Sequence, residues 1–330
     1  MEKTLQKGGA VMTYDVVALG ELLIDFTENG VSQQGNPLFE ANPGGAPCNL
    51  LSMLAKLGRS CAFIGKVGDD MFGRQLRASL QECGICTDAL FTDPDAPTTL
   101  AFVKNAPNGE REFSFLRQNS ADVRLRAEEL PVDLLQNTRI FHYGSLSMTH
   151  EDVRRATRQA IDLAKAGGAL LSFDPNLRPA LWKSLDDARE QMTWGLGQCD
   201  ILKIADNELE FMTDETDILR GAELLRRSYP NIRLLCVTAG AEGSYAFCGE
   251  AYAFAPAFCL GATIDTTGAG DTFGGCVLHH VITCGLELNN ESLQNMLTFA
   301  NAAAYLITTR KGALRAMPDP AAVQAVLRQR

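Results

Sequence analysis

The chain has 330 residues, of which 46% are hydrophobic, and a formal net charge of −10. This length suits one large α/β domain or two smaller ones, and the acidic balance argues against nucleic-acid or anionic-membrane partners. No apolar run approaches the ~18 residues of a membrane span, and the N-terminal segment lacks a signal-peptide core. Ten cysteines, mostly inside apolar runs, and only four histidines lead us to expect reduced thiols, no zinc site and a cytoplasmic location.

In chain order, short apolar runs bounded by turn residues predict strands, and apolar residues at helical spacing predict helices. The predicted strands are Tyr14–Gly20, Cys61–Ile64, Ile140–Tyr143, Leu170–Phe173, Ile201–Ile204, Leu234–Thr238, Ser244–Cys248 and Tyr252–Phe254. The predicted helices are one opened by Pro43–Ala46 and stopped by Gly58, then Asp69–Cys83, Glu151–Ala166, Leu185–Leu196, Asn207–Met212, Ile218–Tyr229, Thr272–Cys284 and Leu293–Thr308. This alternation predicts an α/β fold with a mostly parallel sheet covered on both faces.

Two segments interrupt the alternation. Residues 21–40 contain short strand patterns with turn signals at Asn29-Gly30 and Asn36-Pro37. Residues 98–115 contain two β-rich runs around Asn108-Gly109, which is a strong hairpin signal. Together they indicate a small β sub-domain on the main sheet.

The stretch Asp265–Phe273 combines a glycine turn with the start of an apolar helix. The turn Gly268-Ala269-Gly270 would present unpaired N–H groups at the positive end of the helix dipole, which is a ready anion site. Asp271 is the one charged group on this first turn. It is either a base placed beside a phosphate or an acid that only stabilises the helix dipole.

Polar residues also follow several predicted strands, where open α/β sheets bind ligands. These groups are Asp25, Gly44-Gly45 with Asn49, Asp174–Arg178, Asn207–Glu210 and Thr238–Gly243.

Together these motifs resemble the pfkB, or ribokinase-like, family of carbohydrate kinases, over about Val16 to Pro318. Pro43–Asn49 with Gly65–Asp70 resembles the N-terminal signature of that family, and Asp265–Asp271 resembles the C-terminal one. Asp174–Pro179 is most similar to bacterial fructokinases. The resemblance implies a ribokinase-like three-layer sandwich in a single domain, residues 14–320, with a β-sheet lid from about residues 22–40 and 98–117.

The resemblance also implies roles for individual residues. Asp271 would be the catalytic base, and Gly268, Ala269 and Gly270 would stabilise the transferred phosphoryl group. The implied sugar-binding residues are Asp25, Gly44, Gly45, Asn49, Arg117 and Arg178. The implied ATP-binding residues are Asn207, Glu210, Thr238, Gly240, Gly243 and Asn301, with Glu210 holding Mg²⁺ through water. Asp265 and Thr267 match two ligands of a K⁺ site, and residues 309–313 match the loop that supplies its carbonyls.

Structural interpretations of the same residues stay open. Gly44-Gly45 could be a helix-start turn, Asp25 a strand-end acid, and either arginine a solvated surface residue. Asn207 and Glu210 also have capping-box spacing. Asn301 could be satisfied within the core, and Asp265 could simply hydrogen-bond the glycine turn.

Three departures from the family pattern affect the substrate and cation expectations. Leu23 replaces an Asn of ribokinases, and Gly144–Ser147 lacks an acid found there. Both argue against ribose. Ala316 replaces a frequent Ser of the K⁺ site.

We therefore expect an ATP- and Mg²⁺-dependent kinase that converts D-fructose to fructose 6-phosphate. A kinase for 2-keto-3-deoxygluconate or another sugar or nucleoside is the alternative on the same fold. A non-catalytic sugar-sensing protein is the alternative from another class. The family further implies a homodimer paired through the lid.

Overall fold

The computed structural model describes residues 13–105 and 111–329. Its largest element is a nine-stranded sheet in the order β13-β12-β11-β10-β9-β8-β1-β4-β5. The strands are β1 (Tyr14–Leu19), β4 (Cys61–Gly68), β5 (Leu90–Asp93), β8 (Thr138–Gly144), β9 (Leu170–Asp174), β10 (Ile201–Ala205), β11 (Leu234–Thr238), β12 (Gly243–Cys248) and β13 (Ala251–Pro256). Neighbouring strands pair in parallel from β5 to β11, and β12 and β13 complete the sheet in antiparallel pairing.

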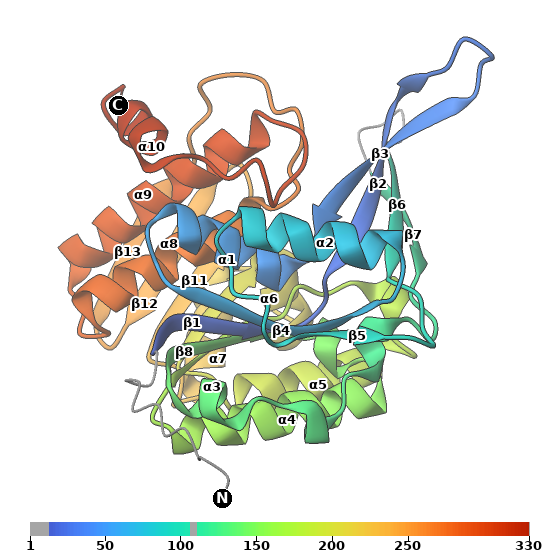
Figure 1. Ribbon diagram of the computed structural model, residues 1–330. Helices are drawn as coiled ribbons and strands as arrows, with labels where there is room; N and C mark the ends of the chain where they lie inside the picture. The colour runs from blue at the N-terminus through green and yellow to red at the C-terminus, as the bar shows by residue number, and fades with distance from the viewer. Residues whose placement is uncertain (1–12, 106–110, 330) are drawn as a thin grey trace, which may run out of the picture.

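Helices cover both faces of this sheet (Figure 1). One face carries α1 (Ala46–Lys56), α2 (Met71–Glu82), α8 (Ala269–Cys284), α9 (Asn290–Thr308) and α10 (Pro320–Leu327). The other carries α3 (Val132–Gln136), α4 (Glu151–Ala166), α5 (Leu185–Leu196), α6 (Asp206–Thr213) and α7 (Ile218–Ser228). Along β1, Val16 and Ala18 enter one hydrophobic core while Val17 and Leu19 enter the other. The continuous apolar run is thus explained by burial on both faces.

A second sheet has four strands in the order β3-β2-β6-β7. These are β2 (Leu23–Val31), β3 (Pro37–Gly44), β6 (Leu100–Asn105) and β7 (Arg111–Leu116). Figure 1 shows β2 and β3 projecting beyond the body of the molecule. Phe26 of β2 stacks on Phe102 of β6 at 5.0 Å and meets Phe72 of α2 edge-on at 5.7 Å, which attaches this sheet to the main body.

The structure confirms the α/β layers and differs from the prediction at one turn of the small sheet. Asn29-Gly30 does not form a turn: it lies inside β2, where the register shifts and Gly30 has φ 88°. The chain turns instead at residues 32–36, where the Asn36 N–H donates to Ser32 Oγ at 3.1 Å. The expected Asn108-Gly109 turn lies outside the described residues, although β6 and β7 on either side of it pair antiparallel.

Elements that carry weak sequence signals complete the fold. β5 was not anticipated, nor were the short α3 and the terminal α10. Helix α10 buries Val323 and Val326 against the same core as α8 and α9. The folded unit therefore continues past residue 320. Within the described ranges, no helix is both long and apolar enough to cross a membrane.

Candidate active site

A cleft of about 570 Å³ opens between the carboxyl ends of the parallel strands, the small sheet and the start of α8. Eleven of the predicted site residues line it, so the structure brings together segments from the whole length of the chain. These are Asp25, Gly45, Asn49, Arg178, Asn207, Thr238, Gly240, Thr267, Gly268, Gly270 and Asp271.

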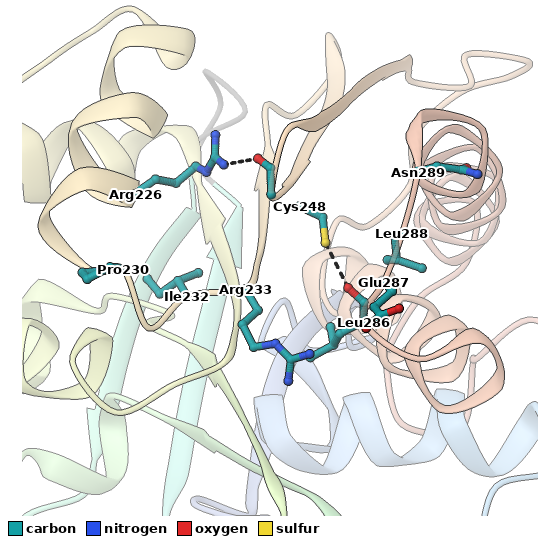
Figure 2. A pocket seen from close by; sticks show the side chains of 10 residues that line it. Arg226, Pro230, Ile232, Arg233, Cys248, Leu286, Glu287, Leu288 and Asn289 are labelled. Atoms are coloured by element: carbon teal, nitrogen blue, oxygen red, sulfur yellow. Dashed lines mark hydrogen bonds between the residues drawn. The ribbon is translucent and has the colours of Figure 1, made fainter.

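A second cavity, of about 640 Å³, lies near the amino end of β11 and the loop before α9 (Figure 2). Arg226 closes one side by donating to the Gly249 carbonyl, and Cys248 Sγ contacts the Leu286 carbonyl oxygen at 3.1 Å. Its lining contains one carboxylate, Glu287, and neither of the predicted glycine turns. The first cavity is therefore the candidate active site.

Asp271 stands on the first turn of α8, directly after the glycine turn. Gly268 precedes the helix in a left-handed conformation, φ 79°, which glycine adopts without steric cost. Asn49 Nδ2 donates to Asp271 Oδ2 at 2.8 Å. Burial and the nearby Asp174 carboxylate raise the pKa of Asp271 to about 6, against the lowering effects of Asn49 and Lys203. The carboxylate is thus ionised at neutral pH yet basic enough to accept a proton.

Lys203 is a cleft residue that the sequence analysis missed. Its Nζ lies 3.1 Å from Asp174 Oδ2, and a Cβ added to Gly270 would lie 3.0 Å from the same Nζ. The ammonium group therefore sits against the glycine turn. Burial alone would lower the pKa of Lys203, but Asp174, Glu208 and Asp271 outweigh it and raise the pKa. A lysine inside the apolar strand β10 was the available signal.

The start of α6 corrects one expectation. The helix begins at Asp206, and Glu208 rather than Glu210 completes its N-terminal cap, accepting the N–H of Ala205 at 2.9 Å and of Leu177 at 2.7 Å. Glu208 is buried and lines the cleft together with Asn207. Glu210 is exposed and does not line it. The capping-box spacing matched Asn207 and Glu210, but the N-cap of α6 is Ala205, two residues earlier, so Glu208 takes the third position of the helix.

The sugar-binding candidates Gly44 and Gly45 contact acidic neighbours so closely that a side chain would clash. A Cβ on Gly44 would collide with Asp25 Oδ2, and one on Gly45, φ 124°, with the Glu21 carbonyl oxygen. Burial raises the pKa of Asp25 to about 7, against the lowering effect of Arg178. Arg178 itself is half-buried and lines the cleft.

Glu21 is a second cleft residue missed from the sequence. It is 4% exposed, and its Oε1 accepts the Ala46 N–H at 3.0 Å. Burial raises the pKa of Glu21 to about 7, although Arg117 opposes the shift. An acid immediately after a buried strand was the signal for it.

Arg117 does not line the cleft. Its Nε lies 2.7 Å from Asp122 Oδ2, Nη1 donates to Thr149 Oγ1 at 3.0 Å, and Nη2 donates to the Leu146 carbonyl at 2.9 Å. The guanidinium is 4% exposed, so the structure assigns it to the core beneath the small sheet. All three guanidinium nitrogens have protein partners, so the structure does not bring Arg117 to the cleft, where a sugar contact was expected.

Two of the expected ATP-binding residues have structural partners. Asn301 is buried; its Nδ2 donates to the Ala255 carbonyl at 2.9 Å, and its Oδ1 accepts from Ser244 Oγ at 2.9 Å. A Cβ on Gly243, φ 131°, would collide with the Ala255 carbonyl oxygen. Neither residue lines the cleft, so both shape the loop beside Thr238 and Gly240.

Asp265 joins the glycine turn to the loop before α10. Its Oδ1 accepts the N–H and the hydroxyl of Thr267 at 2.9 and 2.7 Å, and its Oδ2 accepts the Gly312 N–H at 3.1 Å. Ala269, the first residue of α8, is partly buried beside it. The interpretation that Asp265 hydrogen-bonds the turn therefore describes the structure.

Comparison with known proteins agrees with this geometry. Residues 13–320 match the model of the pfkB family carbohydrate kinases. The chain is 42% identical to fructokinase-1 of Zea mays over 311 residues, which are 93% of this chain and 96% of that protein. It is also 42% identical to probable fructokinase-3 of Arabidopsis thaliana over 92% of this chain and 88% of that one.

This chain belongs to the pfkB carbohydrate kinase family.

Solved structures place this family member among fructokinases of known fold. The ATP-bound fructokinase from Xylella fastidiosa matches with a TM-score of 0.86 and 32% identity, covering 96% of this chain and 99% of that one. A fructokinase double mutant from Vibrio cholerae, solved with fructose, ADP and a potassium ion, matches with a TM-score of 0.86, 30% identity and the same coverages. The fold is thus the ribokinase-like α/β fold that the sequence motifs implied.

Proposed function

We propose that this kinase transfers the γ-phosphoryl group of ATP to the 6-hydroxyl of D-fructose, giving D-fructose 6-phosphate. The observation that carries the proposal is the position of Asp271, beside the glycine turn and within the cleft. The fructokinase relatives on both the sequence and the structure side support fructose as the sugar.

In this proposal, Asp271 accepts the proton of the 6-hydroxyl as that oxygen attacks the γ-phosphorus, the bond from the γ-phosphorus to the β–γ bridging oxygen breaks, and ADP leaves. Asn49 holds the carboxylate in place through its 2.8 Å hydrogen bond. The N–H groups of the Gly268–Gly270 turn and the ammonium of Lys203 stabilise the charge that develops on the phosphoryl oxygens. Such fixed donors act without reorganisation during the reaction, which is where most phosphoryl-transfer catalysis originates.

The nucleotide is expected along Asn207, Thr238 and Gly240, which line the cleft beyond the glycine turn. Mg²⁺ commonly uses one or two carboxylates, substrate phosphates and water, so it needs no cage of protein ligands. The described residues contain no cluster of three or more His, Cys, Asp or Glu that could hold a metal. Asp206 and Glu208 line the cleft, and these two carboxylates fit binding of Mg²⁺ through water and substrate phosphates. Mg²⁺ bound there through water would neutralise phosphate charge, with Glu208 in the role first assigned to Glu210.

The cleft favours fructose over 2-keto-3-deoxygluconate. The single carboxylate of 2-keto-3-deoxygluconate would lie among three acidic side chains, since Glu21, Asp25 and Asp271 all line the cleft. Arg117, the cation expected to bind there, is committed to Asp122. An intact Asp271 and glycine turn likewise favour a catalyst over a sugar-sensing protein.

The test is product analysis by phosphorus NMR after incubation with ATP, Mg²⁺ and one sugar at a time. Fructose, ribose and 2-keto-3-deoxygluconate form the panel. We expect turnover of fructose and a single product, fructose 6-phosphate. Fructose 1-phosphate as the main product would contradict the orientation, and turnover of another sugar alone would contradict the substrate.

We further propose that the four-stranded sheet is a lid on a single kinase domain. Leu23, Asp25 and Thr27 of β2 line the cleft, as do Val103 of β6 and Phe115 of β7. One side of the four-stranded sheet therefore faces the part of the cleft that we assign to the sugar. Closure over bound sugar would exclude water from the reaction.

A further inference from the structure

The loop between α9 and α10, residues 309–319, packs against the glycine turn of the candidate active site. Its Gly312 N–H donates to Asp265 Oδ2 at 3.1 Å, and the same carboxylate hydrogen-bonds the start of the glycine turn. The next residue, Ala313, is buried against Gly268: a Cβ added to Gly268 would lie 2.8 Å from the Ala313 Cβ. The loop therefore supports the backbone whose N–H groups would face the phosphoryl group.

The same loop contacts the four-stranded sheet through the two residues that precede Ala313. Lys311 Nζ donates to Asn29 Oδ1 of β2 at 2.8 Å. A Cβ added to Gly312 would lie 3.2 Å from Asn42 Oδ1 of β3. Three consecutive residues thus connect strands of the proposed lid to the glycine turn. Contiguous contacts of this kind can couple two sites, and a measured coupling energy is what establishes the link.

Strand β2 is the part of the small sheet that a bound sugar would contact. Leu23, Asp25 and Thr27 line the cleft, and Asn29 is the next alternate residue along the strand. β2 is hydrogen-bonded on both sides, to β3 and to β6, so a displacement at Asp25 carries to Asn29 instead of being absorbed by local bending. A sugar held at Asp25 would therefore constrain the position of Asn29.

The hydrogen bond between Lys311 and Asn29 has a defined direction, although both side chains are exposed. Asn29 Nδ2 donates to Glu40 Oε2 at 3.2 Å, which leaves Oδ1 as the acceptor for Lys311. An ammonium donor makes a stronger hydrogen bond than a neutral one, and exposure to water keeps the net contribution modest. Removing this bond should therefore change communication between the sites without unfolding the protein.

We propose that Lys311 is a positioning residue: by holding Asn29 of the lid to the 309–319 loop, it makes the geometry of the glycine turn depend on the sugar bound beside β2. This rests on the proposed sugar kinase function and adds how the sugar site acts on the phosphoryl site. Fructose and the nucleotide then each raise the affinity of the other by the same factor.

Lys311→Met tests this role, because methionine keeps an apolar side chain and removes the ammonium. Calorimetry with a non-hydrolysable ATP analogue, with and without saturating fructose and at fixed K⁺ concentration, gives the coupling factor. We expect the factor to exceed one in the wild-type enzyme and to fall about two- to tenfold in Lys311→Met, the range for one net hydrogen bond. The Kd of each ligand measured alone should stay close to the wild-type value, and kcat should fall because the glycine turn is less well positioned.

Three further variants locate the effect. Lys311→Arg keeps a charged donor, so it should retain the coupling. Asn29→Ala should reduce the coupling as Lys311→Met does, and the double variant should be no worse than either single one, because both remove the same contact. Arg315→Met is the matched control: Arg315 lies on the same loop but pairs with Glu82 of α2, so its loss should leave the coupling unchanged.

A coupling factor of one in the wild-type enzyme, or an unchanged factor in Lys311→Met, would overturn the proposal. An equal decrease in Arg315→Met would also overturn it, because the effect would then belong to the loop as a whole. If Lys311→Met fails to fold, Asn29→Ala tests the same contact from the side of the lid. If the wild-type enzyme instead phosphorylates another sugar, the fructose assignment fails, and the coupling of that sugar to the nucleotide still tests Lys311.

Discussion

Asp271 shows how neighbouring residues set the chemistry of one side chain. Burial and the Asp174 carboxylate raise the pKa, and Asn49, Lys203 and Arg178 lower it, with a result of about 6. An isolated carboxylate with an ordinary pKa near 4 would be a weaker base. The surroundings therefore make Asp271 basic without leaving it protonated at pH 7.

Asp271→Asn should reduce kcat by about 10²- to 10⁴-fold, because a general base contributes on that scale. Folding and ATP affinity should stay close to those of wild type, since asparagine has nearly the same shape. Steady-state kinetics with fructose and calorimetry with an ATP analogue measure the two quantities. Retention of more than about a tenth of wild-type kcat would remove Asp271 from the role of base.

The pH dependence follows from the same shift. Proton acceptance requires ionised Asp271, so kcat should be level above pH 7 and fall as the pH drops through about 6, where the carboxylate becomes protonated. Lys203→Met removes a cation that lowers the pKa of Asp271, so the falling limb should move to higher pH. A limb that stays at the same pH in Lys203→Met would show that another group controls it.

We also propose that a K⁺ ion binds beside Asp265 and Thr267. Asp265 already accepts three hydrogen bonds from Thr267 and Gly312, and a K⁺ ion beside it would add charge near the glycine turn. We expect kcat to be several-fold higher in K⁺ than in tetramethylammonium at equal ionic strength, a difference lost in Asp265→Ala. Equal rates in the two salts would leave Asp265 as a structural residue.

At the scale of elements, the small sheet is fastened to the main body by a buried ion pair. Thr99, before β6, donates to Asp122 at 2.6 Å, and Arg117, after β7, lies 2.7 Å from the same carboxylate. Burial would raise the pKa of Asp122, but Arg117, Ser120 and Thr99 outweigh it and hold the pKa below its usual range. The residue before β6 and the residue after β7 thus bind the same carboxylate, that of Asp122.

Arg117→Met should therefore lower the free energy of unfolding by about 3–5 kcal/mol, the usual cost of leaving one member of a buried pair alone. Urea denaturation measures it. Arg315→Met is the matched control, because that arginine pairs with Glu82 at the surface with 50% and 59% of the side chains exposed, and its loss should cost within about 1 kcal/mol. An equal decrease in the free energy of unfolding in the two variants would contradict a stabilising role for the Arg117–Asp122 ion pair.

Closure of the lid is tested by hydrogen exchange. Amides of β2 and of residues 100–103 in β6 should exchange more slowly when fructose saturates the enzyme, because the sugar would hold these strands against the cleft. Helix α7, on the opposite face of the main sheet, should be unaffected. Exchange in the small sheet that is insensitive to fructose would argue for a fixed cover instead.

At the scale of the whole molecule, the small sheet is also the place for the proposed homodimer. Large apolar side chains remain exposed on it, among them Leu38 at 47% and Leu116 at 58%. Sedimentation should give twice the 35.8 kDa of one chain, and Leu116→Glu should shift the population toward monomer. Leu224→Glu, which alters a 45% exposed leucine on α7, should leave the mass unchanged.

Local signals in the sequence were enough to predict the layers and the glycine turn before α8. Strands such as β1 are continuous apolar runs because parallel strands are buried on both faces. The turn before α8 could be identified because backbone conformation at Gly268 and the charge of Asp271 are properties of adjacent residues. The cleft residues Asp25, Asn49 and Asp271 followed from the family resemblance of such short motifs.

Contacts between distant segments were decided only by the tertiary structure. Arg117 was expected at the sugar, yet Asp122 and the Leu146 carbonyl bind it in the core. Glu208 replaced Glu210 at the cleft because the end of β10 fixes where α6 begins. Lys203 and Glu21 became cleft residues because parallel strands place their carboxyl ends together, and the order of strands in a sheet is set by packing across the chain rather than by local sequence.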